Sequence, residues 1–171
     1  ETNHMADILL PDATDLESLQ LIRIGATKFF ENFWRHEGWA IRQPAVEPVV
    51  DCRDMTDIAT ALAKEAGVLE AYNEAINRGA AGISLKDYAI DTATEHDRDA
   101  IWDAVCKAAS HEVSDGAEIH DLEWFKEKGY MLTDFPELDW YLYTRMEDQN
   151  LRFKMPYQER MTRHGRELAN R

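Results

Sequence analysis

The densest group of charged residues outside a predicted helix is Asp51-Cys52-Arg53-Asp54. A guanidinium among carboxylates can present a fork of hydrogen-bond donors to a ligand. The same residues also suit an ion-paired corner, in which Arg53 holds neighbouring carboxylates and Asp54 caps the following helix. The structural interpretation is favoured, because charged clusters where helices begin usually serve as caps.

A small enzyme that uses Asp51, Arg53, Asp54 and His36 is the catalytic alternative. These groups show no recognisable acid–base or nucleophile spacing. The six histidines include no H-E-x-x-H motif, and the chain has no Walker loop, G-x-S-x-G or G-x-G-x-x-G motif. We therefore assign no catalytic residue and no metal ligand from the sequence.

The two cysteines, Cys52 and Cys106, lie far apart and form no C-x-x-C pair, so both are expected to be buried thiols. Aromatic side chains gather in two later stretches, around residues 122–125 and 139–143. Each stretch suits either a core or a surface that docks on another domain, because aromatic anchors are enriched at interfaces. The candidate docking residues are Trp124, Phe125, Trp140 and Tyr141.

Helical signals dominate the elements that must position these residues. Apolar spacing predicts a helix over residues 19–34, and Pro44 and Pro48 indicate an extended, non-central segment over 39–50. Further helices are expected after Asp54 or Thr56 up to Gly67, then over 69–77, after Thr94, over 122–128, from Pro136, and over 157–170. Residues 6–11 suit a short buried strand or extended segment, and a short extended piece is expected around 88–90. The predicted fold is mainly α, an irregular helical domain with a short extended N-terminal segment.

Composition limits the classes of partner. The 171 residues carry a net charge of −14, which repels phosphate backbones and anionic headgroups, so nucleic acid is not an expected partner. No apolar run approaches the roughly 20 residues of a membrane span, so no membrane insertion is expected.

Several segments together resemble the catalytic subunits of the molybdopterin oxidoreductases, the dimethyl sulfoxide reductase family. The first is Glu1-Thr2-Asn3, followed by Ala6-Asp7-Ile8-Leu9-Leu10-Pro11-Asp12-Ala13-Thr14 and Glu17. The second is Arg42-Gln43-Pro44 with Glu47-Pro48, Asp51, Arg53-Asp54, Asp57-Ile58 and Leu62-Ala63. The later ones are Glu123-Trp124-Phe125-Lys126 with Gly129-Tyr130, and Arg152-Phe153 with Pro156-Tyr157-Gln158-Glu159-Arg160. Residues 80–110 are the least diagnostic part.

The resemblance implies a parent enzyme with a bis-molybdopterin guanine dinucleotide centre of molybdenum or tungsten, often with an iron–sulfur cluster. Residues 1–18 would end a cofactor-binding α/β domain, and residues 19–171 would form a helical connecting or inserted region. The family's cluster cysteines and its molybdenum-ligating Cys, Ser or Asp match no residue of this chain, so no cofactor is expected to be bound by it. The fold would then be a piece excised from a larger α/β multidomain enzyme.

These considerations predict an internal structural region that is not catalytic alone. Its partners would be the remaining domains of the parent subunit and an iron–sulfur electron-transfer subunit. In isolation, residues 1–18 would be poorly packed or would borrow contacts from a second copy, which makes a homo-oligomer an expectation. The family occurs on both sides of the bacterial inner membrane, so cytoplasmic and periplasmic locations stay open. The alternative is a stand-alone acidic helical module that binds a protein partner.

Overall fold

The computed structural model describes residues 2–24, 36–48, 50–79 and 82–134. Contacts between Cα atoms place all of these residues in one compact unit. The expected helices from Pro136 and over 157–170 lie outside the described residues, as do Trp140 and Tyr141.

The described unit combines a small antiparallel sheet with α-helices. The strands are β1 (Gln20–Ile24), β2 (His36–Arg42) and β3 (Tyr130–Asp134), in the spatial order β1-β2-β3. The helices are α1 (Met55–Glu65), α2 (Leu69–Gly79), α3 (Arg98–Val113) and α4 (Leu122–Lys128). The prediction of a mainly α fold is therefore wrong, because a three-stranded sheet forms one layer of the domain.

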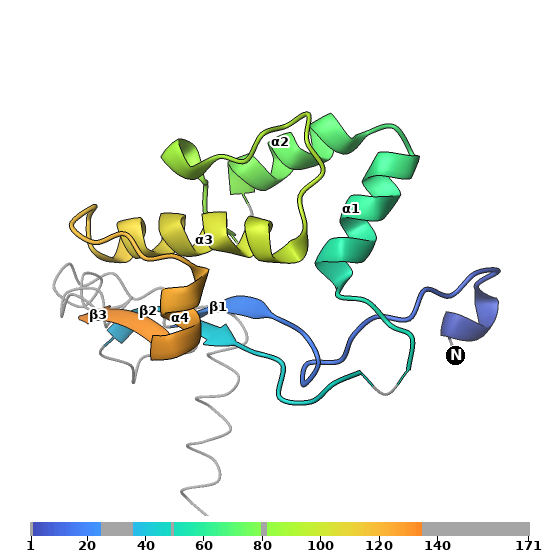
Figure 1. Ribbon diagram of the computed structural model, residues 1–171, viewed down its shortest axis with the longest axis horizontal. Helices are drawn as coiled ribbons and strands as arrows, with labels where there is room; N and C mark the ends of the chain where they lie inside the picture. Colours follow the sequence, from blue (N-terminus) through green and yellow to red (C-terminus); the bar gives the residue numbers. More distant parts are fainter. Residues whose placement is uncertain (1, 25–35, 49, 80–81, 135–171) are drawn as a thin grey trace, which may run out of the picture. The chain divides into compact units, whose positions relative to one another are not determined.

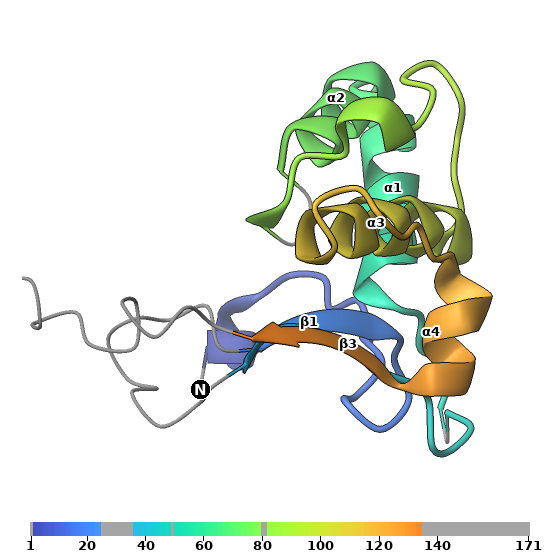
Figure 2. The same ribbon diagram turned by 90° about the vertical axis from the view of Figure 1, so that its left-hand side faces the viewer.

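Helix α3 lies across one face of the sheet, and α2 lies on the far side of α3 from the sheet (Figure 1 and Figure 2). The core fills the space between α3 and the strands. Its fully buried side chains include Trp39 of β2, Val105 and Cys106 of α3, and Phe125 of α4. The Arg23 guanidinium lies over the Trp39 ring at 5.4 Å, so one strand residue shields the largest core aromatic.

The sheet overturns the helix predicted over residues 19–34, because residues 20–24 form strand β1. Leu19 and Leu21 are buried while Ile22 is exposed, which is the alternation of a strand. Residues 39–42 are extended as predicted, but the prediction of a non-central segment is wrong because β2 is the central strand. Its prolines follow Arg42, where the strand has already ended, and so they remove no bond from the sheet.

Three of the helices begin at an aspartate whose carboxylate accepts from a backbone N–H. Asp54 accepts from Thr56 N and Asp121 accepts from Trp124 N, as expected. Helix α3 is capped by Asp97 rather than by Thr94, whose hydroxyl donates to Asp91 instead. Each cap satisfies a backbone donor that the first helical turn leaves unpaired.

Some of the remaining local predictions are confirmed and others are wrong. Helices α2 and α4 match the predicted ranges, and α4 ends at Gly129 with a φ of 86°. The extended piece expected around residues 88–90 is only partly found, because Tyr88 belongs to a short 3-10 helix, η3 (Lys86–Tyr88), and no strand follows it. Residues 6–11 form no strand, and their side chains are exposed, so they are not the buried strand that one interpretation predicted.

Candidate functional site

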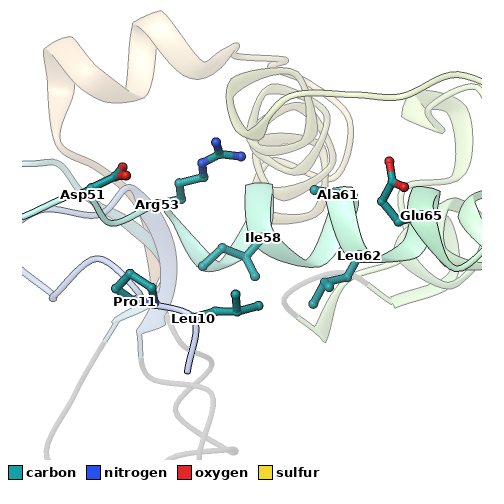
Figure 3. Close-up of a pocket in the computed structure, with 8 residues that line it drawn as sticks. All are labelled: Leu10, Pro11, Asp51, Arg53, Ile58, Ala61, Leu62 and Glu65. Carbon is teal, nitrogen blue, oxygen red and sulfur yellow. The ribbon is translucent and has the colours of Figure 1, made fainter. Parts of the chain in front are cut away.

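A groove runs between the N-terminal segment and helix α1 (Figure 3). It encloses about 330 Å³. One wall comes from the N-terminal segment, the other from α1, and the residues just before α1 contribute two charged side chains. We call it the α1 groove, and its lining residues are Leu10, Pro11, Asp51, Arg53, Ile58, Ala61, Leu62 and Glu65.

Backbone hydrogen bonds hold the N-terminal segment beside the start of α1. Arg53 N donates to Pro11 O at 3.3 Å, and Ala13 N donates to Arg53 O at 2.9 Å. These bonds form an isolated parallel bridge between Asp12 and Arg53. Leu10 is thereby placed opposite the α1 side chains, although residues 10 and 58 are far apart in the sequence.

Asp54 anchors the same end of α1 to the core. Its carboxylate is buried and accepts from Thr56 N at 2.9 Å and from Leu19 N at 3.3 Å. The Arg98 guanidinium lies 3.9 Å from it. These partners compensate for the burial of the Asp54 carboxylate. Because they come from the start of β1 and of α3, Asp54 fixes the position of the first turn of α1 relative to both elements.

The groove is apolar along its length and charged at its ends. Asp51 and Arg53 lie side by side at one end, and Glu65 lies at the other, with Leu10, Ile58 and Leu62 between them (Figure 3). The apolar lining suits contact with an apolar side chain of a partner. The charged groups at the two ends suit contact with polar or charged residues on either side of that side chain.

The thiol of Cys52 lies between the two charged residues in the chain. Its pKa is raised by desolvation and by the negative charges of Glu17, Asp12 and Asp51. A raised pKa keeps the thiol protonated at neutral pH, so Cys52 is a poor nucleophile.

The apolar surface continues beyond the groove. Ile8, Leu9 and Leu10 are 80%, 61% and 54% exposed, and Leu62 of α1 is 53% exposed. Ile58, Leu62, Ala63 and Ala66 recur at helical spacing in α1, and this spacing predicts one apolar face that packs on the core. The buried residues of α1 are instead Thr60 and Ala63, so part of the expected core face is turned outward.

The structure separates the four residues of the small-enzyme alternative. Asp51 and Arg53 line the groove together, while Asp54 is buried as the cap of α1. His36 begins β2, where its Nε2 lies 3.3 Å from Asp134 Oδ1, and it does not line the groove. The sequence prediction that Asp54 caps the following helix is confirmed.

The structure also bears on the aromatic residues of α4. Phe125 is fully buried in the core, and so it presents no surface for docking. Trp124 is half-buried and stacks on His120 with ring centroids 3.8 Å apart. Trp140 and Tyr141 are outside the described residues, so no docking surface made of all four residues is seen.

One polar pair was missed from the sequence. Tyr88 Oη and His111 Nδ1 are 2.9 Å apart, and the two rings meet edge to face. The sequence offered no signal for this pair, because the residues lie on separate elements. It joins η3 to the last turn of α3, and it is distant in the chain from every residue that lines the groove.

The described residues contain neither a cluster of metal-binding side chains nor a helix suited to span a membrane. There, no group of three His, Cys, Asp or Glu side chains is arranged to hold a metal ion. None of the described helices is both long enough and apolar enough to cross a bilayer.

Comparison with known proteins finds no matching family model, no similar curated protein and no similar solved structure.

Proposed function

We propose that this chain is a non-catalytic structural region of a larger molybdopterin-dependent oxidoreductase subunit. The rest of that subunit would cover the apolar N-terminal segment and the α1 groove. The partners are then the remaining domains of the same polypeptide, and an iron–sulfur electron-transfer subunit would bind the assembled enzyme.

The observation that carries the proposal is the exposed run Ile8-Leu9-Leu10 beside the exposed Leu62 of α1. Large apolar side chains that lie together on a surface mark a place where another surface packs. The same run belongs to the segment Ala6-Asp7-Ile8-Leu9-Leu10-Pro11 that carries the family resemblance. A segment with the pattern of a buried strand is thus uncovered in this chain, which supports a covering domain.

The α1 groove does not fit the cofactor of the parent enzyme. A molybdopterin guanine dinucleotide carries phosphates, whereas the groove places Asp51 and Glu65 against the single guanidinium of Arg53. Two carboxylates repel a phosphate group, and the chain as a whole carries a net charge of −14. The proposed role is therefore to pack against the cofactor-binding domains rather than to bind the cofactor.

The test is the mass of the native polypeptide that contains this sequence in its source cells, with molybdenum, tungsten and pterin assayed on the purified protein. The proposal expects a polypeptide several times heavier than 19.7 kDa that carries pterin and one of the two metals. A metal-free polypeptide of about 19.7 kDa overturns it and favours a stand-alone module that binds a protein partner. A large polypeptide without pterin would refute the enzyme assignment and keep the structural role.

A further inference from the structure

The α1 groove has an apolar middle and charged ends, and this pattern determines which segment can bind in it. Its middle is apolar, with Leu10 facing Ile58 and Leu62 (Figure 3). A carboxylate lies at each end, Asp51 before α1 and Glu65 in its last turn. Ile58 and Glu65 are seven residues apart on the helix, which corresponds to a rise of about 10 Å. The apolar stretch therefore extends over about two helical turns between acidic ends.

We infer that the groove binds an amphipathic segment whose apolar side chains are flanked on both sides by Lys or Arg. This inference rests on the proposed function, because it names the chemistry of the surface that covers the groove. Leu10, Ile58 and Leu62 receive the apolar side chains, and the two carboxylates pair with the flanking cations.

The end of the groove near Asp51 is acidic despite the presence of Arg53. Asp12 pairs with Arg53 in the backbone bridge and so lies at the same end of the groove as Asp51. Two carboxylates outweigh one guanidinium, so a cation on the partner gains there and an anion loses. Like-charge contacts at an interface disfavour the wrong partner, which is how such an arrangement gives specificity.

Burial of the exposed apolar side chains supplies the attraction. A Leu side chain that becomes fully covered gains about 1.5–3 kcal/mol. Leu9, Leu10 and Leu62 are each more than half exposed, so a segment that covers them gains several such contributions before the ordering cost of association is subtracted. The flanking charges then set orientation and selectivity.

The experiment uses the 171-residue chain and two labelled 16-residue peptides. Both peptides are helix formers with Leu at positions i, i+3, i+4 and i+7; one has Lys at both ends, and the other has Glu. Fluorescence anisotropy measures the Kd of each at 50 mM and 300 mM salt. We expect the Lys peptide to bind at least tenfold more tightly at 50 mM salt, with a smaller advantage at 300 mM because salt screens the exposed charges.

Matched variants separate the groove from the general acidity of the chain. Glu65→Lys and Leu62→Glu are each expected to weaken binding of the Lys peptide at least tenfold. Glu70→Lys makes the same charge change on exposed α2, and Val68→Glu makes a similar change at a residue that is 51% exposed and does not line the groove. These two controls are expected to change Kd less than threefold. Equal binding of both peptides, or equal effects of Glu65→Lys and Glu70→Lys, overturns the inference.

The native polypeptide gives a second readout. A zero-length carbodiimide cross-link is expected to join Asp51 or Glu65 to a lysine outside these 171 residues. Cross-links from these carboxylates only to a second copy, with a dimer that Leu62→Glu abolishes, would overturn the inference in favour of self-association. A metal-free 19.7 kDa polypeptide would defeat the proposed function and leave the peptide result standing, so the two failures are distinguishable.

Discussion

The side-chain amide of Asn73 lies 2.8 Å from the carbonyl oxygen of Thr94, and this contact joins α2 to the loop that leads into α3. The same Nδ2 also donates to Thr92 O at 3.0 Å and to Asp91 O at 3.3 Å. Asn73 is fully buried, and its amide NH₂ carries two hydrogens, which it shares among these three carbonyl groups. Asn73 thus helps to fix the path of this loop, together with Asn77, whose side-chain amide bonds to Ile90 O and N.

Asn73→Ala is expected to lower the free energy of unfolding by about 2–4 kcal/mol, because it removes the donor to three loop carbonyl groups and leaves a gap at a fully buried position. Urea unfolding followed by circular dichroism measures the change. Glu74→Ala, at the neighbouring exposed position, is the control and is expected to change stability by less than about 0.5 kcal/mol. Equal effects of the two substitutions would show that the loop is held by other contacts.

Gly38 permits β2 and β3 to approach closely. A Cβ atom at this position would lie 2.1 Å from the carbonyl oxygen of Met131 and 2.9 Å from Leu132 Cα, both of which are backbone atoms of β3. Its φ of 154° also lies where side chains are rarely found. Gly38→Ala is therefore expected to lower the free energy of unfolding by about 3 kcal/mol, since β2 and β3 must move apart.

Thermal unfolding of Gly38→Ala is best compared with that of Gly79→Ala, because a Cβ atom at Gly79 would meet nothing within 4 Å. The control is expected to be neutral or slightly stabilising. A Gly38→Ala protein with unchanged Tm would mean that β3 does not pair with β2 in this register.

The sequence predicts most of the structure that depends on neighbouring residues alone, although it places the cap of α3 at Thr94 and not at Asp97. Asp54 and Asp121 cap their helices and Gly129 ends α4, because caps and stops are contacts within one turn. Strand β1 was mistaken for a helix because its identity depends on pairing with β2, from which it is separated by residues 25–35. Spacing alone also does not distinguish the inward face of an apolar helix from its outward face.

Because spacing does not show which apolar residues of a helix face outward, the sequence does not predict the α1 groove. Ile58 and Leu62 are one helical turn apart, so they read as core residues, yet Leu62 is exposed and both line the groove. The opposite wall comes from Leu10 and Pro11 through the bridge at Arg53, a contact between residues about forty positions apart. No local pattern predicts such a contact, although the charged cluster at 51–54 did mark its position.

The ion pairs of Asp99 predict a pH dependence of stability. Burial alone raises the pKa of Asp99, but the hydrogen bond and charge of Arg98, together with Lys126, outweigh it and lower the pKa. Arg98 Nε lies 2.9 Å from Asp99 Oδ1, and Lys126 Nζ lies 3.4 Å from Oδ2. A carboxylate whose pKa is lower in the folded state stabilises the protein above its unfolded pKa of about 4, and this contribution is lost as the pH falls through the folded value.

Asp99→Asn is therefore expected to destabilise the protein at pH 7 and pH 5 by a constant amount, below about 1 kcal/mol because the side chain is 45% exposed. The difference from the unmodified protein should decrease as the pH falls below about 4, as measured by urea unfolding at several pH values. A difference that increased on acidification would contradict the assigned ion pairs.

The two cysteines differ in burial and should differ in reactivity. Burial, with smaller contributions from Asp103 and Asp121, raises the pKa of Cys106 to about 12, and its side chain is fully buried. Cys52 is half-buried and also has a raised pKa. Iodoacetamide at pH 8 is expected to modify Cys52 slowly and Cys106 only after unfolding, since the thiolate is the reacting form. Peptide mapping by mass spectrometry measures both. If iodoacetamide modified Cys106 in the folded Cys52→Ser variant, the burial of Cys106 would be contradicted.

The adjacent aromatic residues of α4 give the sharpest distinction between a core role and a docking role. Phe125 is fully buried in the core, whereas the half-buried Trp124 stacks on His120 and meets the Phe125 ring edge to face. Phe125→Ala is expected to cost about 3–5 kcal/mol, because it opens a cavity in the core. Trp124→Ala is expected to cost about 1–2 kcal/mol, since its ring is already in partial contact with water.

Urea unfolding measures both substitutions, and Glu127→Ala on the same helix is the control, with an expected change below about 0.5 kcal/mol. If Phe125→Ala left stability unchanged, the ring would not lie in the core, and the docking role predicted from the sequence would return. If Trp124→Ala cost as much as Phe125→Ala, the whole aromatic pair would be structural. The expected inequality leaves Trp124 alone, among the described aromatic residues of α4, as a side chain that a partner can contact.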